Sequence, residues 1–257
     1  MADAYFSLFS LILLIPLSIL IFLYFIVRPR PVRVPIKNRH VFITGGSSGI
    51  GLALAHQFAQ LGSDVTLLAR NVSKLEEAKE SIKLATGRDV RIFSADVRDY
   101  ESVKKVVEEV GVIDVLICNH GVYVPQELET QELEEIKFMI DVNLMGTFHL
   151  IKAALPGMKK NRVERGPGSI AIMSSQAGQV GIYGYTAYSA SKFALRGMAE
   201  ALQQEIIADN IHISLIFPPD TETPGFAEGL NSDLLSYLTL LNCTNCPQYH
   251  ACIFSFI

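Results

Sequence analysis

The chain has 257 residues, of which 49% are hydrophobic and 19% charged, so it can form one ordinary domain with a sizeable core and is not a disordered chain. Its 22 Lys and Arg residues against 26 Asp and Glu residues give a net charge of -4. This balance excludes a general electrostatic attraction to nucleic acid, so we expect no nucleic-acid partner.

The first predicted element is a membrane-spanning helix. Residues 5–27 contain no Asp, Glu, Lys, Arg or His. A helix of this length reaches about 35 Å, which is enough to cross a hydrocarbon core of about 30 Å. A cleaved signal peptide fits less well, because only Asp3 is charged before the apolar run and no small-residue cleavage site follows it. We therefore expect residues 1–27 to form a retained anchor.

Basic residues after this span predict its orientation. Five of them lie in the next twelve positions with no acid between them: Arg28, Arg30, Arg33, Lys37 and Arg39. Positive charge stays on the cytoplasmic side of a membrane, so the rest of the chain is expected to face the cytosol. Three prolines make residues 28–38 a stiff, extended linker between the anchor and the following domain.

Strands alternate with helices from residue 40 onward. Short apolar runs predict strands at 40–44, 64–69, 90–95, 113–118, 169–173 and 211–217. Helical periodicity predicts helices at 50–61, 71–86, 99–110, 132–159 and 187–208, with two helices inside the fourth segment. This alternation predicts right-handed crossovers and therefore an α/β fold with a parallel, doubly wound sheet of the Rossmann type, spanning residues 39–228.

The turn after the first predicted strand has the residues of a phosphate-binding loop. It runs Thr44-Gly-Gly-Ser-Ser-Gly-Ile-Gly51, with glycine spacing one residue longer than the usual dinucleotide fingerprint. A turn of this kind brings backbone N–H groups at a helix N-terminus close to a pyrophosphate. A purely structural turn is the alternative, but a strand before the loop and a helix after it favour nucleotide binding. The residues assigned to the cofactor here are Gly45, Ser47, Ser48, Gly49 and Gly51.

The end of the second predicted strand indicates which cofactor is bound. An NAD enzyme places Asp or Glu there to hold the ribose 2′-hydroxyl, whereas this chain has Leu67-Leu68-Ala69-Arg70. Arg70 and Lys74, one helical turn apart, offer hydrogen-bond donors to a 2′-phosphate. A solvated charge at the helix start is the alternative role for Arg70. The missing acid leads us to predict NADPH as the cofactor.

Several motifs in order resemble the short-chain dehydrogenase/reductase family over about residues 37–228. They are the glycine loop, Asp96, Cys118-Asn-His-Gly121, Asn143, Ser174-Ser175 and Tyr188-Ser-Ala-Ser-Lys192. The resemblance implies that Asp96 contacts adenine, that Asn119 belongs to the cofactor site, and that Asn143 holds a water leading to Lys192. Two positions depart from the family pattern: His120 replaces a small residue, and Pro218-Pro219 stands where Pro-Gly is usual.

The resemblance also implies a chemistry for Tyr188 and Lys192, which lie four positions apart and therefore on one helix face. A nearby ammonium lowers the pKa of a phenol from about 10, so we expect Lys192 to lower that of Tyr188. Tyr188 would then donate a proton to a carbonyl oxygen, and Lys192 would also hold the nicotinamide ribose. Ser175 would polarise the carbonyl, with Ser174 as the alternative if the turn is offset. An exposed pair with no catalytic role is the competing interpretation of Tyr188 and Lys192.

Residues 174–197 and 218–228 resemble family members that reduce a long-chain keto-amine lipid in sphingolipid synthesis, on the cytosolic face of the endoplasmic reticulum. The resemblance implies this lipid as the substrate, the endoplasmic reticulum membrane as the location, and a homodimer. A membrane-anchored hydroxysteroid or retinoid dehydrogenase is the alternative. Some such enzymes face the lumen, and the glycosylation sequons at Asn71 and Asn242 would fit that placement.

The last predicted segment, residues 229–257, is a short tail that departs from the family pattern. The family usually continues here with a substrate-covering helix and a seventh strand. Three of the four cysteines of the chain lie in this tail, Cys243, Cys246 and Cys252. Together with His250 they have a spacing that would suit zinc ligands. No second ligand pair accompanies them, so we expect no metal site and no disulfide scaffold. A catalytically weak form that only binds nucleotide remains the third hypothesis.

Overall fold

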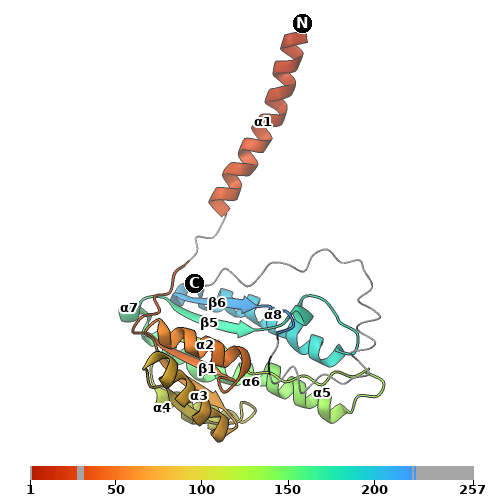
Figure 1. Ribbon diagram of the computed structural model, residues 1–257. Helices are drawn as coiled ribbons and strands as arrows, with labels where there is room; N and C mark the ends of the chain where they lie inside the picture. Colours follow the sequence, from red (N-terminus) through yellow and green to blue (C-terminus); the bar gives the residue numbers. More distant parts are fainter. Residues whose placement is uncertain (1, 28–31, 222, 224–257) are drawn as a thin grey trace. The chain divides into compact units, whose positions relative to one another are not determined.

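The computed structural model describes residues 2–27, 32–221 and 223, and the chain divides into two units, Met1–Arg33 and Val34–Ile257. The first unit contains α1 (Ala2–Val27), a continuous helix of 26 residues that includes Pro16 (Figure 1). Between Ile12 and Ile26 its side chains are exposed and almost all apolar, and the Ser18 hydroxyl donates to the carbonyl oxygen of Ile15. The helix is therefore confirmed, and its insertion into a membrane stays a prediction. The tail 229–257, including its cysteines, lies outside the described residues.

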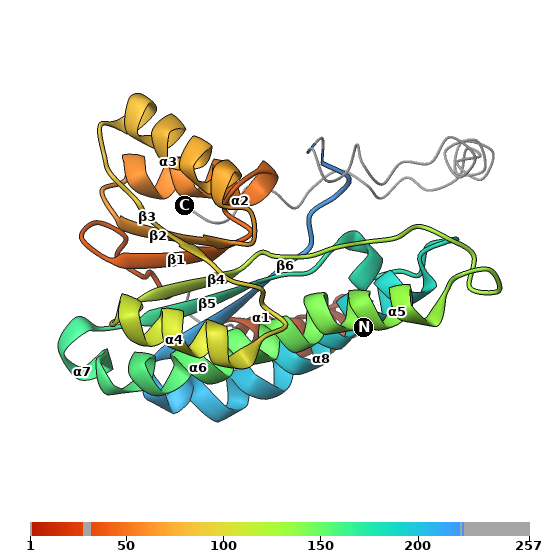
Figure 2. The same cartoon turned by 90° about the horizontal axis from the view of Figure 1, so that it is seen from below.

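The second unit is built on one parallel sheet of six strands in the order β3-β2-β1-β4-β5-β6 (Figure 2). The strands are β1 (His40–Thr44), β2 (Asp64–Ala69), β3 (Arg91–Ser94), β4 (Val115–Cys118), β5 (Gly168–Met173) and β6 (Ile211–Ile216). All six predicted strands are present, with ends that shift by at most two residues, so the doubly wound α/β fold is confirmed. The strand order reverses between β1 and β4, and ligands of such sheets bind beyond the carboxyl ends of the strands at this point.

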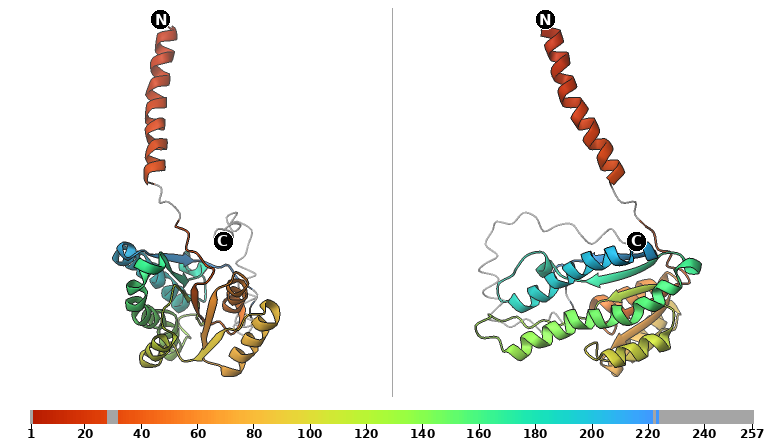
Figure 3. Two further views of the ribbon diagram at one scale, coloured as in Figure 1. Left: turned by 90° about the vertical axis from the view of Figure 1, so that its left-hand side faces the viewer. Right: turned by 180° about the vertical axis from the view of Figure 1, so that it is seen from behind.

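Helices cover both faces of the sheet (Figures 2 and 3). α2 (Gly49–Gln60) and α3 (Val72–Thr86) lie on one face, and α4 (Tyr100–Val110), α6 (Gly146–Lys160) and α8 (Thr186–Ile206) lie on the other. β1 shows how the sequence sorts its side chains between the two cores. Val41 and Ile43 pack with α2 and α3, while Phe42 packs with the opposite helices, as the two-residue period of a strand requires.

The segment predicted to hold two helices, 132–159, forms one unbroken helical run. α5 (Leu133–Ile140) continues through a π-helical turn, η1 (Asp141–Met145), directly into α6. Leu133–Lys160 is long and apolar enough to cross a membrane by composition, yet Leu150 and Met158 are fully buried in the domain core, so this run is a core helix. π-Turns inside helices are frequent at functional sites, and this one carries Asn143. The short helix α7 (Arg162–Arg165) follows and was not expected.

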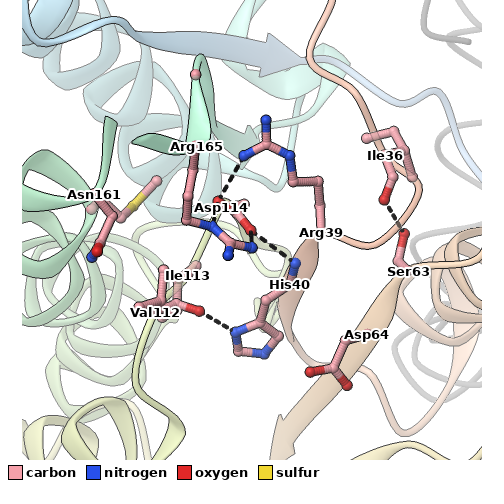
Figure 4. Close-up of polar contacts among 12 residues, drawn as sticks. Ile36, Arg39, His40, Ser63, Asp64, Val112, Ile113, Asp114, Asn161 and Arg165 are labelled. Atoms are coloured by element: carbon pink, nitrogen blue, oxygen red, sulfur yellow. Dashed lines mark hydrogen bonds and ion pairs between the residues drawn. The ribbon is translucent and has the colours of Figure 1, made fainter. Parts of the chain in front are cut away.

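The start of the second unit is held against the sheet by side chains from the predicted linker. Val34 and Ile36 pack on the core formed with α2 and α3. The Ser63 hydroxyl donates a hydrogen bond to the carbonyl oxygen of Ile36 at 3.1 Å (Figure 4). The carboxyl-terminal part of the linker is therefore packed against the domain.

A buried carboxylate joins several segments at the edge of the sheet where the strands begin. Asp114, directly before β4, is fully buried and accepts hydrogen bonds from Arg39 Nη1 (3.1 Å), the backbone N–H of His40 (3.0 Å), Arg162 Nη2 (2.9 Å) and Arg165 Nε (2.8 Å) (Figure 4). Burial alone would raise the pKa of Asp114. The hydrogen bonds from Arg165, the His40 N–H and Arg162 outweigh it, and together they hold this pKa well below its usual range. Asp114 thus ties β1, β4 and α7 together.

Candidate active site

A cavity of about 460 Å³ lies at the carboxyl ends of the central strands, where the strand order reverses. Loops that follow β1, β2, β3 and β4 form its walls. The structure brings eight of the predicted cofactor residues to this one cavity: Gly45, Ser47, Ser48, Gly49, Arg70, Lys74, Asp96 and Asn119. Residues from four separate loops therefore line one continuous space.

The glycine loop packs so closely that a pyrophosphate can reach its backbone. Gly51 lies in the first turn of α2, where a Cβ atom would overlap the carbonyl oxygen of Gly45, so only glycine permits this packing. Ser48 is the N-cap of α2, but its hydroxyl makes no capping hydrogen bond and no acid lies in the first turn. The positive end of the helix is therefore available to an anion, and the loop fits a dinucleotide phosphate.

Two basic residues, Arg70 and Lys74, line the part of the cavity that follows β2. Arg70 follows the end of β2, and its carbonyl oxygen accepts from the Ser94 hydroxyl at 3.0 Å. Asn71 caps α3 by accepting from the backbone N–H of Lys74 at 3.0 Å. Both contacts fix the backbone, and the Arg70 and Lys74 residues line the cavity together. This arrangement fits a phosphorylated ribose better than a free 2′-hydroxyl.

Asp96 is the one acid among the described residues that line the cavity, and Arg98 holds its side chain. The guanidinium of Arg98 donates from Nε (3.0 Å) and Nη2 (2.7 Å) to the carboxylate, and it also lies 5.2 Å from the ring centroid of Phe138. The hydrogen bond from Arg98 lowers the pKa of Asp96 against the opposing effect of burial. The carboxylate is therefore held in place at the cavity wall, and its contact with adenine stays a prediction.

Asn119 links the end of β4 to the glycine loop. Its Nδ2 donates to the carbonyl oxygens of Thr44 (3.2 Å) and Gly45 (3.3 Å), and its backbone N–H donates to the Thr44 hydroxyl (3.0 Å). Through these bonds Asn119 fixes the shape of the loop as well as lining the cavity.

His120, the departure from the family pattern, is accommodated by a glycine on the neighbouring helix. The ring places Nδ1 2.8 Å from the Thr44 hydroxyl and Nε2 3.4 Å from the Thr147 hydroxyl. A Cβ on Gly146 would lie 2.7 Å from Val97 Cγ2 and 3.0 Å from His120 Nε2, so the missing side chain leaves room for both Val97 and the imidazole. Burial, with the nearby charge of Lys192, lowers the pKa of His120 to about 3, so the ring is neutral at pH 7.

Tyr188 and Lys192 project from α8 toward the end of β5. Lys192 Nζ lies 5.5 Å from the centroid of the Tyr188 ring and donates to the carbonyl oxygen of Met173 at 3.0 Å. Lys192 is buried, and burial lowers its pKa to about 8. Burial also raises the pKa of Tyr188, an effect that a hydrogen bond from Ser175 reduces and the charge of Asp220 reinforces.

The expectation that Lys192 lowers the pKa of Tyr188 was wrong for this structure, because burial dominates. The ammonium donates its hydrogen bond to the Met173 carbonyl oxygen. Tyr188 is accordingly a protonated phenol at neutral pH, which is the state that a proton donor needs.

The two candidate serines have different neighbours. Ser174 is buried, and its hydroxyl donates to the backbone carbonyl oxygen of Lys192 at 3.0 Å, which fixes α8 against β5. Ser175 is the N-cap of the turn η2 (Gln176–Gly178), where its hydroxyl accepts from the N–H of Ala177 at 3.1 Å, and it acts on Tyr188 by lowering the pKa of that phenol. Because the Ser174 hydroxyl is bound to the Lys192 carbonyl oxygen, Ser175 stays the serine expected to face a substrate carbonyl.

Asn143 is fully buried in the π-turn and holds the loop after β4. Its Oδ1 accepts from the N–H of Val122 (2.8 Å), and its Nδ2 donates to the Val122 carbonyl oxygen (2.9 Å) and to the Ser191 hydroxyl (3.0 Å). The Ser191 hydroxyl in turn donates to the carbonyl oxygen of Tyr188 at 2.7 Å. Asn143 thus connects this loop to α8, and the water that it was expected to hold stays a prediction.

Sequence reasoning missed several residues at this site. Tyr123 and Tyr185 form an aromatic cluster with Tyr188, and Thr223 lines the cofactor cavity. The closely spaced tyrosines of residues 183–188 were the available signal for Tyr185. Tyr123 comes from a different loop, so no pattern along the chain joins it to the other two tyrosines.

Known proteins are similar to this chain in sequence and in fold. The 3-dehydrosphinganine reductase TSC10B of Arabidopsis thaliana is 65% identical over 227 residues, which cover 88% of this chain and 68% of that protein. The 3-dehydrosphinganine reductase of Danio rerio is 41% identical over 211 residues, which cover 79% of this chain and 62% of that protein. The chain therefore spans about two thirds of the length of these relatives.

A solved structure of a short chain dehydrogenase has the same fold as this chain. The short chain dehydrogenase of Escherichia coli CFT073, complexed with NADPH, superposes with a TM-score of 0.71 and is 29% identical, over 77% of this chain and 84% of that one. The family model for short chain dehydrogenases matches residues 39–233. These matches agree with the parallel doubly wound sheet, and the chain belongs to the short chain dehydrogenase family.

Proposed function

We propose that this chain is a reductase that uses NADPH to convert the ketone of 3-dehydrosphinganine to the alcohol of sphinganine, in sphingolipid synthesis. The observation that carries the proposal is the meeting of Tyr188, Ser175 and Lys192 beside the nucleotide cavity. Relatives that bear the name of this activity support the substrate, and structural neighbours complexed with NADP or NADPH support the cofactor.

The residues of the site suggest how a ketone is reduced. Bound NADPH supplies a hydride to the carbonyl carbon. Ser175 donates a hydrogen bond to the carbonyl oxygen and polarises it. Tyr188 transfers its phenolic proton to the same oxygen as negative charge develops there, which completes the alcohol. Lys192, with a pKa of about 8, can return a proton to the tyrosine at neutral pH.

An assay with the purified chain tests this proposal directly. The chain in detergent micelles is mixed with NADPH and 3-dehydrosphinganine, and the loss of NADPH absorbance is followed while sphinganine is identified as the product. The fluorescence of bound NADPH is measured on the same sample. Bound NADPH without oxidation would contradict the reductase and support a protein that only binds nucleotide.

Replacing Arg70 by aspartate should shift the cofactor preference toward NADH by about tenfold, because a charge-assisted hydrogen bond to the 2′-phosphate is lost and repulsion replaces it. The measurement is the ratio of kcat/KM for NADPH to that for NADH. Arg88→Asp is the matched control, because Arg88 is exposed and lies before β3, at the end of the sheet where the strands begin, whereas Arg70 follows the end of β2. An unchanged ratio in Arg70→Asp would show that Arg70 does not contact the phosphate.

We also infer that α1 anchors the chain in the membrane of the endoplasmic reticulum, with the domain in the cytosol. Asn71 supports the cytosolic side. Its side chain caps α3, and the residue lines the nucleotide cavity, so a glycan there would occupy the wall of the cofactor site. The second sequon, at Asn242, lies outside the described residues. We further propose, from the family resemblance, that the domain pairs as a homodimer.

Deleting residues 1–27 should release the chain from membranes while its affinity for NADPH stays unchanged. The hydrophobic segment is lost, whereas all described residues of the nucleotide cavity lie in the second unit. Sedimentation after carbonate extraction measures the first effect, and NADPH fluorescence measures the second. Continued sedimentation with the membranes would show that another segment also inserts.

A further inference from the structure

Three tyrosines form one aromatic cluster at the reacting end of the site. The rings of Tyr123 and Tyr185 are stacked, with centroids 6.1 Å apart and planes 11° from parallel. The ring of Tyr188 lies 5.8 Å from the first and 6.0 Å from the second. The N–H of Gln126 donates to the carbonyl oxygen of Gly184 at 2.8 Å, which holds the two loops of the cluster together.

One carboxylate lies in the loop that follows β6. Asp220 is exposed and lies two residues after Pro218, whose carbonyl oxygen is bound by Gln176, the neighbour of Ser175. Its charge adds to burial in raising the pKa of Tyr123, Tyr185 and Tyr188. The loop that carries it is held at both sides. The N–H of Gln176 donates to the carbonyl oxygen of Pro218 (3.1 Å), and the Thr221 hydroxyl donates to that of Pro219 (2.8 Å).

The charges around the cluster favour a cation. No ion pair joins Asp220 to a basic side chain in the described part of the second unit. Lys192 is the cation of the catalytic group, but it is buried and donates to the Met173 carbonyl oxygen. A carboxylate beside aromatic rings is a combination that binds ammonium groups, by ion pairing and by cation–π attraction.

We propose that Asp220 and the tyrosine cluster form a recognition site for a primary ammonium group on the carbon next to the substrate ketone. The inference rests on the proposed reduction of a 2-amino-3-keto lipid. In such a lipid the nitrogen is two bonds from the carbonyl carbon. A carbonyl held by Tyr188 and Ser175 therefore places the ammonium beside the other two tyrosines and within the field of Asp220.

This site explains how the enzyme distinguishes a keto-amine from a simple ketone. The alkyl chain of a lipid offers only non-directional apolar burial. The ammonium is the one charged group next to the reacting carbon. Its ion pair with Asp220 therefore fixes which face of the ketone is presented for reduction and which end of the lipid enters the site. Asp220 is thus a specificity residue, and Tyr185 supports it with its ring.

The test compares two lipids that differ at the nitrogen, which is a charged amine in one and an uncharged acetylated amide in the other; the Asp220 variant separates the effect of charge from the added bulk. The full chain in detergent micelles is loaded with NADP⁺, and the Kd values of sphinganine and of N-acetylsphinganine are measured by calorimetry. The parent chain should prefer sphinganine by about tenfold, the combined scale of an exposed ion pair and a cation–π contact. In Asp220→Asn the ratio of the two Kd values should fall toward one, and Tyr185→Leu should lower it about threefold.

Asp89→Asn serves as the charge-matched control and should keep the parental ratio. Asp89 is exposed, pairs with Lys79 at 3.8 Å, and lies before β3, at the opposite edge of the sheet. An equal affinity of the parent for both lipids, or an unchanged ratio in Asp220→Asn, would overturn the ammonium site. Turnover of 3-dehydrosphinganine, measured in parallel, separates the ammonium site from the proposed reductase activity. Turnover without a preference for sphinganine would refute only the ammonium site. A preference for sphinganine without turnover would refute only the reductase activity.

Discussion

Replacing Tyr188 by phenylalanine should lower kcat/KM by at least about 100-fold, the usual scale for the loss of a positioned proton donor. The phenolic proton has no substitute in the described site, because the Lys192 ammonium is directed at the Met173 carbonyl oxygen. NADPH affinity should survive. The phenyl ring keeps its packing against Tyr123 and Tyr185, and the glycine loop is untouched.

The measurement combines steady-state turnover with the fluorescence of bound NADPH. Tyr100→Phe is the matched control, because Tyr100 begins α4 and packs on His149, on a different helix from Tyr188. This control should keep the parental rate. A Tyr188→Phe variant within a few-fold of the parent would remove Tyr188 from proton transfer, and a parallel loss of NADPH binding would mean that the substitution disturbs the fold.

Local patterns were sufficient for the strands and the phosphate loop. A two-residue alternation of apolar side chains places Val41, Phe42 and Ile43 on alternate faces without reference to the rest of the chain. The glycine loop was equally accessible, because its spacing and the flanking strand and helix lie within a short stretch of sequence. Helix caps at Asn71 and Asp99 also agree with the expected starts of α3 and α4.

Features that depend on contacts between distant segments were beyond these patterns. The π-turn at Asp141–Met145 depends on where the Asn143 side chain finds partners, at Val122 and Ser191. The space around His120 likewise depends on Gly146, which belongs to another element. Spacing along the chain could not decide between Ser174 and Ser175. The two serines are neighbours at the end of a strand, where the side chains of successive residues point in opposite directions. The pKa of Tyr188 was misjudged because spacing reveals the nearby ammonium but not the burial of both groups.

The position of Asp114 also depends on distant contacts, and it leads to the prediction with the largest effect on stability. Asp114→Asn should lower the free energy of unfolding by about 3 kcal/mol or more, since removing one partner of a buried ion pair leaves the others uncompensated. Arg162 is almost as buried as Asp114, and an amide cannot neutralise it. Urea unfolding at pH 7 measures the loss, on a chain without residues 1–27 and with NADPH absent.

The pH dependence of stability gives an independent check. The pKa of Asp114 is lower in the folded state than in the unfolded state, where it is about 3.9. The ionised carboxylate therefore stabilises the fold fully above about pH 3.9, and this stabilisation is lost as the pH falls from there toward the folded-state pKa. The parent should therefore lose stability below about pH 4 more steeply than Asp114→Asn, and the two unfolding curves should converge. Asp209→Asn is the control, because its pair with Lys159 is partly exposed, and it should change stability by less than about 1 kcal/mol. If Asp114→Asn and Asp209→Asn unfolded at the same urea concentration, Asp114 would not be the residue that joins β1, β4 and α7.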